Sequence, residues 1–127
     1  MPMPREPIST PGAPQPAGAY SQAIAVGSLV FLAGQGPFQP DGSKVEGSFE
    51  DEARQTFRNL AAVAEAAGAS LADAVRVGVF LRDMKNFPAM NEIYREFFPE
   101  PLPARTTIQS DLPGFEIEVD AVLLREP

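Results

Sequence analysis

Strand signals and helix signals alternate along this chain, and their order constrains the fold more than any other feature. Short apolar or alternating runs typical of strands lie at 23–33, 75–82, 104–109 and 115–121. Apolar residues at helical spacing lie at 49–67 and 87–98. The order is therefore two strands, a helix, a strand, a helix and two strands, with no internal repeat and no linker. This order predicts one α+β domain built on a mixed or mostly antiparallel sheet.

A sheet whose helices cover one face leaves its other face in need of a partner. Self-association is the simplest way to cover that face, so we expect an oligomer.

The first helix has the clearest boundaries. Ser48 is a suitable N-cap, and the acidic residues at 50–52 favour the positive end of the helix dipole. Gly68 suits the C-terminal cap. The second helix is expected to begin after Asp83 or Asn86 and to end before Pro99.

The N-terminal segment is rich in proline. Six of the 14 prolines lie at or before Pro16. Proline at this density favours an extended arm, so we expect an arm over residues 1–17 and a single folded domain over 18–127.

Composition excludes several kinds of chemistry. The chain has no His and no Cys, which removes thiolate nucleophiles, thiolate metal sites and disulfides. The net charge of −7 and the scattered basic residues argue against nucleic-acid binding. No apolar run approaches the ~20 residues that a membrane span needs, and no signal core is present. We therefore expect a soluble cytoplasmic protein without a metal.

Four features are candidates for a small-molecule site. Arg105 lies between Ala and Thr at the start of a β-branched run, where a guanidinium can bind a carboxylate through two parallel hydrogen bonds. On spacing alone, a surface residue or a structural ion pair is the favoured interpretation. The other candidates are an acidic strand face, an aromatic residue near the start of the domain and a glycine pair: Glu116, Glu118 and Asp120; Tyr20; Gly34 and Gly36. Each of these also has a structural explanation.

Taken together, these segments resemble the RidA family of reactive-intermediate imine deaminases, also called the YjgF family. The resemblance covers about Gly18 to Leu124 and rests on several ordered motifs. These motifs are Gly18-Ala19-Tyr20-Ser21-Gln22-Ala23, Phe31-Leu32-Ala33-Gly34-Gln35, Met90-Asn91-Glu92-Ile93-Tyr94-Arg95-Glu96-Phe97-Phe98, Pro103-Ala104-Arg105-Thr106-Thr107 and Glu116-Ile117-Glu118-Val119-Asp120-Ala121.

The resemblance implies a chorismate-mutase-like fold, with a mixed β-sheet, two main helices packed on one face, and a homotrimer with clefts between subunits. It also implies cofactor-free hydrolysis of 2-imino acids, of the 2-iminopropanoate and 2-iminobutanoate type, to 2-keto acids and ammonia. In this interpretation Arg105 binds the substrate carboxylate and Asp120 activates water, with Glu118 next in line for that role. The remaining substrate-binding residues are Tyr20, Gly34, Asn91 and Thr107.

This chain departs from the family pattern at several positions. Asp120 stands where Glu is usual, Thr107 where Cys is common and Ala19 where Pro is common. The turn after Pro113 is a residue short, which bears on the register of the final strand. Two alternatives therefore stay open: a module of the same fold that binds a small carboxylate metabolite or acts as a chaperone, and, with less support, a ribonuclease or translation inhibitor.

Overall fold

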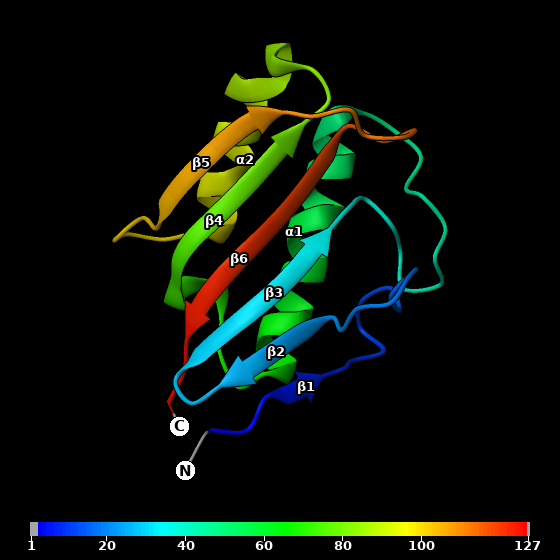
Figure 1. Cartoon of the computed structure of the whole chain (residues 1–127). Helices are drawn as coiled ribbons and strands as arrows, with labels where there is room; N and C mark the ends of the chain where they lie inside the picture. Colours follow the sequence, from blue (N-terminus) through cyan, green and yellow to red (C-terminus); the bar gives the residue numbers. More distant parts are fainter. Residues whose placement is uncertain (1–2, 127) are drawn as a thin grey trace.

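The computed structural model describes residues 3–126 and shows a six-stranded sheet with both α-helices packed against the same side (Figure 1). The strands, in chain order, are β1 (Glu6–Ile8), β2 (Ala23–Val26), β3 (Leu29–Gln35), β4 (Ala74–Leu81), β5 (Ala104–Gln109) and β6 (Ile117–Leu124). The helices are α1 (Phe49–Ala66) and α2 (Phe87–Phe97), and each is accompanied by a short 3-10 turn, η1 (Leu71–Asp73) or η2 (Met84–Asn86).

The sheet is mixed, as predicted. Its strand order is β1-β2-β3-β6-β4-β5, and every neighbouring pair is antiparallel except β4 with β5. The α+β class and the two helices on one face are therefore confirmed. The parallel pair requires a crossover connection, and α2 provides it.

The core lies between the sheet and the helices. Alternate residues of β4 and β6 are fully buried there, among them Val77, Val79 and Ile117, while α1 presents Phe57 and Leu60 to them. Burying a side chain of this size stabilises the fold by about 1.5–3 kcal/mol.

The expected ends of the first helix are confirmed. Ser48 accepts a hydrogen bond from the Asp51 backbone N–H at 3.2 Å, and the Asp51 carboxylate accepts one from the Ser48 N–H at 3.0 Å. Gly68 follows the helix with φ of +80°, a conformation that glycine adopts without a steric penalty. At the second helix, Asp83 caps the preceding turn η2, and Asn86 makes no side-chain capping bond.

The boundary of the folded domain differs from the expectation. Residues 6–8 form β1, which pairs with β2, and Ile8 and Ala13 are buried in the core. The buried Gln22 carboxamide accepts from the Thr10 N–H at 2.7 Å and donates to the Pro14 carbonyl at 2.8 Å. The prolines keep this segment extended, but its backbone polar groups are satisfied by the fold, so it packs instead of remaining a separate arm.

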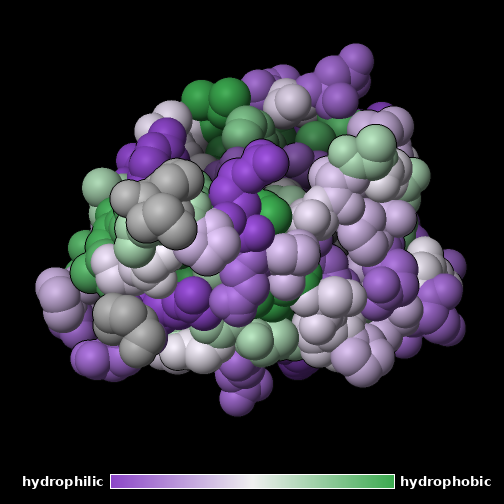
Figure 2. All heavy atoms as spheres, turned by 60° about the horizontal axis from the view of Figure 1, so that its bottom comes forward, coloured by the Kyte–Doolittle hydropathy of each residue, from purple (hydrophilic) through white to green (hydrophobic). Residues whose placement is uncertain are grey.

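The face of the sheet opposite the helices is open. It exposes large apolar side chains, with Phe31 45%, Ile108 47% and Leu124 47% exposed. Figure 2 shows the end of the molecule near both termini. The surface there is mostly hydrophilic, with hydrophobic residues scattered among the polar ones. Among residues 3–126, no helix is both long and apolar enough to cross a membrane.

Candidate functional site

Arg105 is held between the sheet and α2. It lies on β5 opposite Val77 of β4, on the face that the helices cover. Its guanidinium carbon lies 4.6 Å from the centre of the Tyr94 ring and 5.4 Å from that of Phe87. Both rings come from α2, and contacts of this kind attract a cation to the face of the ring. The guanidinium is therefore fixed in position by packing.

The charge of Arg105 is not neutralised within the chain. Among residues 3–126, Arg105 makes no ion pair, although five other Lys and Arg side chains do so. It lines a cavity of about 260 Å³ together with residues from α2 and the loop before β5: Asn91, Tyr94, Arg95, Leu102 and Pro103. A fixed, partly buried and unneutralised guanidinium is suited to binding a carboxylate.

The Tyr94 hydroxyl is an unusual feature of this cavity. Tyr94 is 3% exposed, and its hydroxyl has no hydrogen-bond partner among the described residues. Burial raises the pKa of this hydroxyl above its ordinary value, while the positive charge of Arg105 opposes the rise. The hydroxyl therefore stays neutral and can donate a hydrogen bond.

A second cavity, of about 350 Å³, contains Tyr20 and Gly34. The Tyr20 hydroxyl accepts a hydrogen bond from the Ala17 N–H at 3.2 Å, which ties the ring to the N-terminal segment. Glu118 of β6 completes the polar lining near Gly34. A Cβ atom added at Gly34 would lie only 2.7 Å from Glu118 Oε2, so glycine at this position leaves room for the carboxylate.

Glu118 has the properties of a general base. Its side chain is partly buried, and burial raises its pKa above the ordinary value, with a further contribution from the negative charge of Asp120. A carboxylate whose pKa is raised in this way accepts a proton more readily near neutral pH.

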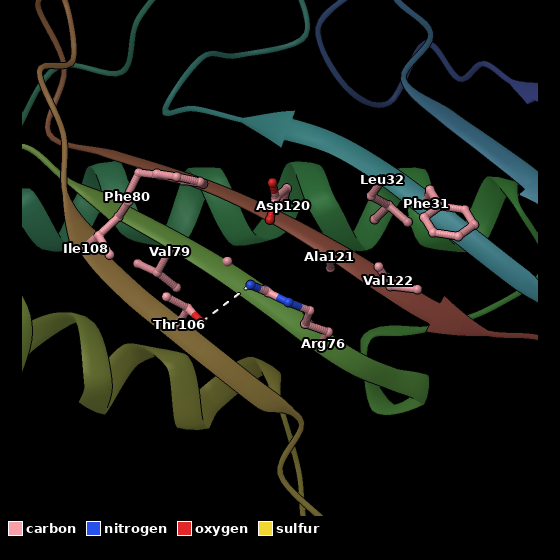
Figure 3. A pocket seen from close by; sticks show the side chains of 11 residues that line it. Phe31, Leu32, Arg76, Val79, Phe80, Thr106, Ile108, Asp120, Ala121 and Val122 are labelled. Carbon is pink, nitrogen blue, oxygen red and sulfur yellow. Dashed lines mark hydrogen bonds between the residues drawn. The ribbon is translucent and has the colours of Figure 1, made fainter.

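Asp120 lies in a different cavity from Tyr20 and Gly34. It faces a hollow of about 370 Å³ on the open side of the sheet, where it lies near Gly78 (Figure 3). Arg76 in the same hollow donates to Thr106 Oγ1 at 3.4 Å (Figure 3). The structure thus brings Glu118, and not Asp120, to the cavity that holds Tyr20 and Gly34.

Apart from Asp120, the predicted site residues form two separate groups within one chain. Arg105 and Asn91 line the cavity beside α2, and Thr107 is two residues from Arg105 on the same side of β5. Tyr20, Gly34 and Glu118 line the other cavity. Glu118 lies on the open face of the sheet, opposite to the face of Arg105, because side chains alternate along each strand.

Three relevant residues lay outside the sequence-based site. Tyr94 had a helical spacing that is typical of core residues, and its contact with Arg105 depends on how α2 packs. Phe38 and Phe115, which line the Glu118 cavity, lie in loops of the structure, although Phe115 begins the alternating run at 115–121. Their proximity to each other was not visible in the sequence.

This chain is similar to known proteins over nearly its full length. The family model described as Endoribonuclease L-PSP matches residues 10–124. A 2-iminobutanoate/2-iminopropanoate deaminase from Dermatophagoides farinae is 44% identical over 126 residues, covering 97% of this chain and 98% of that protein.

Solved structures show the same fold. The crystal structure of RidA from the Antarctic bacterium Psychrobacter sp. is 38% identical with a TM-score of 0.89, and the match covers 94% of this chain and 99% of that one. E. coli TdcF with bound serine is 32% identical with a TM-score of 0.88, over 95% and 99% of the two chains. The likeness is thus nearly full-length in both sequence and structure, and this chain belongs to the RidA/YjgF/L-PSP family.

Proposed function

We propose that this protein hydrolyses reactive 2-imino acids to 2-keto acids and ammonia without a cofactor. The observation on which this rests is the unneutralised Arg105 guanidinium, held against the Tyr94 ring at 4.6 Å in a cavity. The family membership and the deaminase name of a relative at 44% identity support the reaction type.

The substrate carboxylate binds Arg105 through charge-assisted hydrogen bonds. A protonated imine carbon is already electrophilic, so the reaction needs a positioned water and a proton acceptor. Glu118 accepts a proton from the water as its oxygen bonds to the imine carbon. Glu118 then returns this proton to the amino nitrogen of the tetrahedral intermediate. The C–N bond breaks and the nitrogen leaves as ammonia, while the hydroxyl group gives up its proton and the carbon becomes the carbonyl of the 2-keto acid. The net reaction consumes one water and releases one ammonia.

Glu118 is a better candidate for this base than Asp120. It shares a cavity with Tyr20 and Gly34, whereas Asp120 faces the hollow that contains Arg76. Asp120 acts on the reaction through its charge, which helps to raise the pKa of Glu118. Tyr20 and Gly34 shape the cavity around the imine, and Asn91 and Thr107 lie on the Arg105 side.

The two groups of residues meet if Arg105 of one subunit faces the Glu118 cavity of the next. Such a contact joins two different surfaces of the chain, and contacts of this kind close in rings. The exposed apolar side chains of the open sheet face provide surface for the association. We therefore propose a homotrimer of the 13.6 kDa chain, located in the cytoplasm. Light scattering on a sizing column measures the mass, and cell fractionation tests the location.

The decisive experiment generates 2-iminopropanoate in solution and follows pyruvate and ammonia release. Micromolar wild-type protein is expected to accelerate both, and a Glu118→Gln variant is expected not to. If the wild-type protein binds a small carboxylate but leaves the decay rate unchanged, the binding module is the correct function.

A ribonuclease function has less support, although the name of the family model contains it. The chain has no His for acid–base catalysis, and its net charge of −7 repels a phosphate backbone. Incubation with a structured RNA, under the conditions of the imine assay, is expected to leave the RNA intact.

A further inference from the structure

One wall of the Glu118 cavity is made of two aromatic rings. Phe38 follows β3 and Phe115 precedes β6, so the rings come from loops far apart in the sequence. Their centres are 5.3 Å apart, with an angle of 74° between the ring planes. This is the edge-to-face geometry that aromatic pairs prefer.

Gly36 allows this wall to form. A Cβ atom at this position would lie 2.9 Å from the Phe38 ring and 3.3 Å from the Phe115 ring. Any other residue at position 36 would therefore push the two rings away from the backbone.

Buried polar side chains of α1 anchor both loops. Asn59, which is 1% exposed, donates to the carbonyls of Gly36 at 3.1 Å and Phe38 at 2.7 Å. Glu52, which is 5% exposed, accepts from the Glu116 N–H at 3.0 Å and so anchors the residue next to Phe115. Lys44 forms an ion pair with the same Glu52 at 3.2 Å. The aromatic wall is thus held in place by α1.

The wall is not part of the main core. Phe38 and Phe115 are partly buried, and both face the cavity that contains Tyr20, Gly34 and Glu118. A cavity of about 350 Å³ lies in the range that accepts ligands much larger than a three-carbon imino acid. Apolar surface beside the general base is therefore available for a substrate side chain.

We propose that the Phe38–Phe115 wall binds the side chain of the substrate, and that the preferred substrates are 2-imino acids with large apolar side chains, of the leucine or phenylalanine type. This inference rests on the proposed function, because Glu118 as the base fixes the imine carbon beside this wall. The wall provides contact area that a methyl group does not use.

The test compares three imines, generated by an amino-acid oxidase from alanine, leucine and phenylalanine. Competition with semicarbazide for each imine gives the kcat/KM of the wild-type protein. The leucine- and phenylalanine-derived imines are expected to have a kcat/KM on the order of ten-fold or more above that of the alanine-derived imine. The difference is expected mainly in KM, because the wall binds the side chain and not the reacting atoms.

Phe38→Ala and Phe115→Ala are expected to bring the ratio of these kcat/KM values close to one. Phe38→Leu keeps an apolar wall and is expected to retain part of the preference. Met84→Ala is the matched control, since it removes a similarly apolar side chain from an exposed turn outside the cavity. It is expected to leave the ratio at the wild-type value.

The outcomes separate this inference from the proposed function. If no imine is hydrolysed, the proposed function fails and the inference fails with it. If the alanine-derived imine is hydrolysed with a kcat/KM equal to or above the others, only the inference is overturned. An equal loss for all three imines in a folded Phe38→Ala variant also overturns it, because the rings would then be structural. Should a variant not fold, the wild-type series alone decides.

Discussion

At the scale of single residues, packing determines what Arg105 can do. The rings of Phe87 and Tyr94 hold the guanidinium, and the described part of the chain supplies no carboxylate to neutralise it. A surface arginine would lose side-chain entropy on binding an anion, whereas this one has already lost it on folding. In the proposed function, the site is therefore prepared for a carboxylate before the substrate arrives.

Replacing Arg105 by Ala is expected to abolish detectable imine hydrolysis, and Arg105→Lys is expected to leave little. The loss of a charge-assisted pair costs on the order of 2–5 kcal/mol, or roughly thirty-fold to several thousand-fold in kcat/KM. Steady-state kinetics measures the loss, and circular dichroism checks that the variant is folded. Wild-type turnover by folded Arg105→Ala would refute the carboxylate anchor.

The pH dependence of the reaction is expected to report on Glu118. The base must be ionised, so kcat/KM falls as the pH decreases through the pKa of Glu118. Burial raises this pKa, and the charge of Asp120 raises it further. Asp120→Asn removes that charge, so it is expected to shift the acidic limb of the profile to lower pH while the protein stays active. An inactive but folded Asp120→Asn variant would instead assign the base to Asp120.

At the scale of elements, the N-terminal segment becomes part of the site through one side chain. The Gln22 carboxamide, 2% exposed, binds backbone groups of Thr10, Ala13 and Pro14. The segment that it anchors forms one side of the Glu118 cavity. A strand of three residues, β1, would be marginal without this attachment.

Gln22→Ala is expected to lower the free energy of unfolding by about 1–3 kcal/mol, because it leaves buried backbone groups without partners. Urea denaturation measures this change, and limited proteolysis is expected to cleave the variant within residues 9–17. Gln15→Ala is the matched control, since Gln15 is exposed and makes one hydrogen bond to Thr10. Resistance of Gln22→Ala to protease would show that other contacts hold the segment.

At the scale of the whole molecule, the sheet separates the two groups of site residues. Arg105 lies on the face covered by the helices, and Glu118 lies on the open face. In the proposed function, one chain therefore presents its carboxylate-binding residue and its water-activating residue in different directions. Under this proposal, a complete site requires more than one copy of the chain.

Mixing two inactive variants tests this arrangement. Oligomers refolded from equal amounts of Arg105→Ala and Glu118→Gln chains are expected to regain about a quarter of the wild-type activity. A site takes Arg105 from one subunit and Glu118 from its neighbour, and each residue is intact in half of the subunits, so about a quarter of the sites are complete. Arg105→Ala mixed with the double variant is the control and is expected to stay inactive. Native mass spectrometry verifies that mixed oligomers form. Mixed oligomers without activity would place both residues in a site within one chain.

Much of the fold followed from local patterns. The helix that begins after Ser48 was predicted with its capping residues because a capping box and a left-handed glycine are local features. The strand predicted over 75–82 is present as β4 (Ala74–Leu81). Its apolar side chains alternate, so they can all pack against the helices only when that one face of the strand is buried. The N-terminal segment was predicted wrongly, since its proline content indicates an extended backbone but does not indicate what that backbone binds.

The sequence by itself determined the order of the elements and the class of the fold, because periodicity and helix caps are local properties. Only the tertiary structure decided which carboxylate stands beside Gly34. Leu32 of β3 pairs with Ala121 of β6, and Gln35 pairs with Val119. Three residues along β3 therefore correspond to two along β6, so the register of the two strands shifts between these pairs. Such a bulge redirects side chains without a periodic signal. It is a consequence of how two distant strands pair, and for that reason the sequence alone did not reveal Glu118 as the partner of Gly34 and Tyr20.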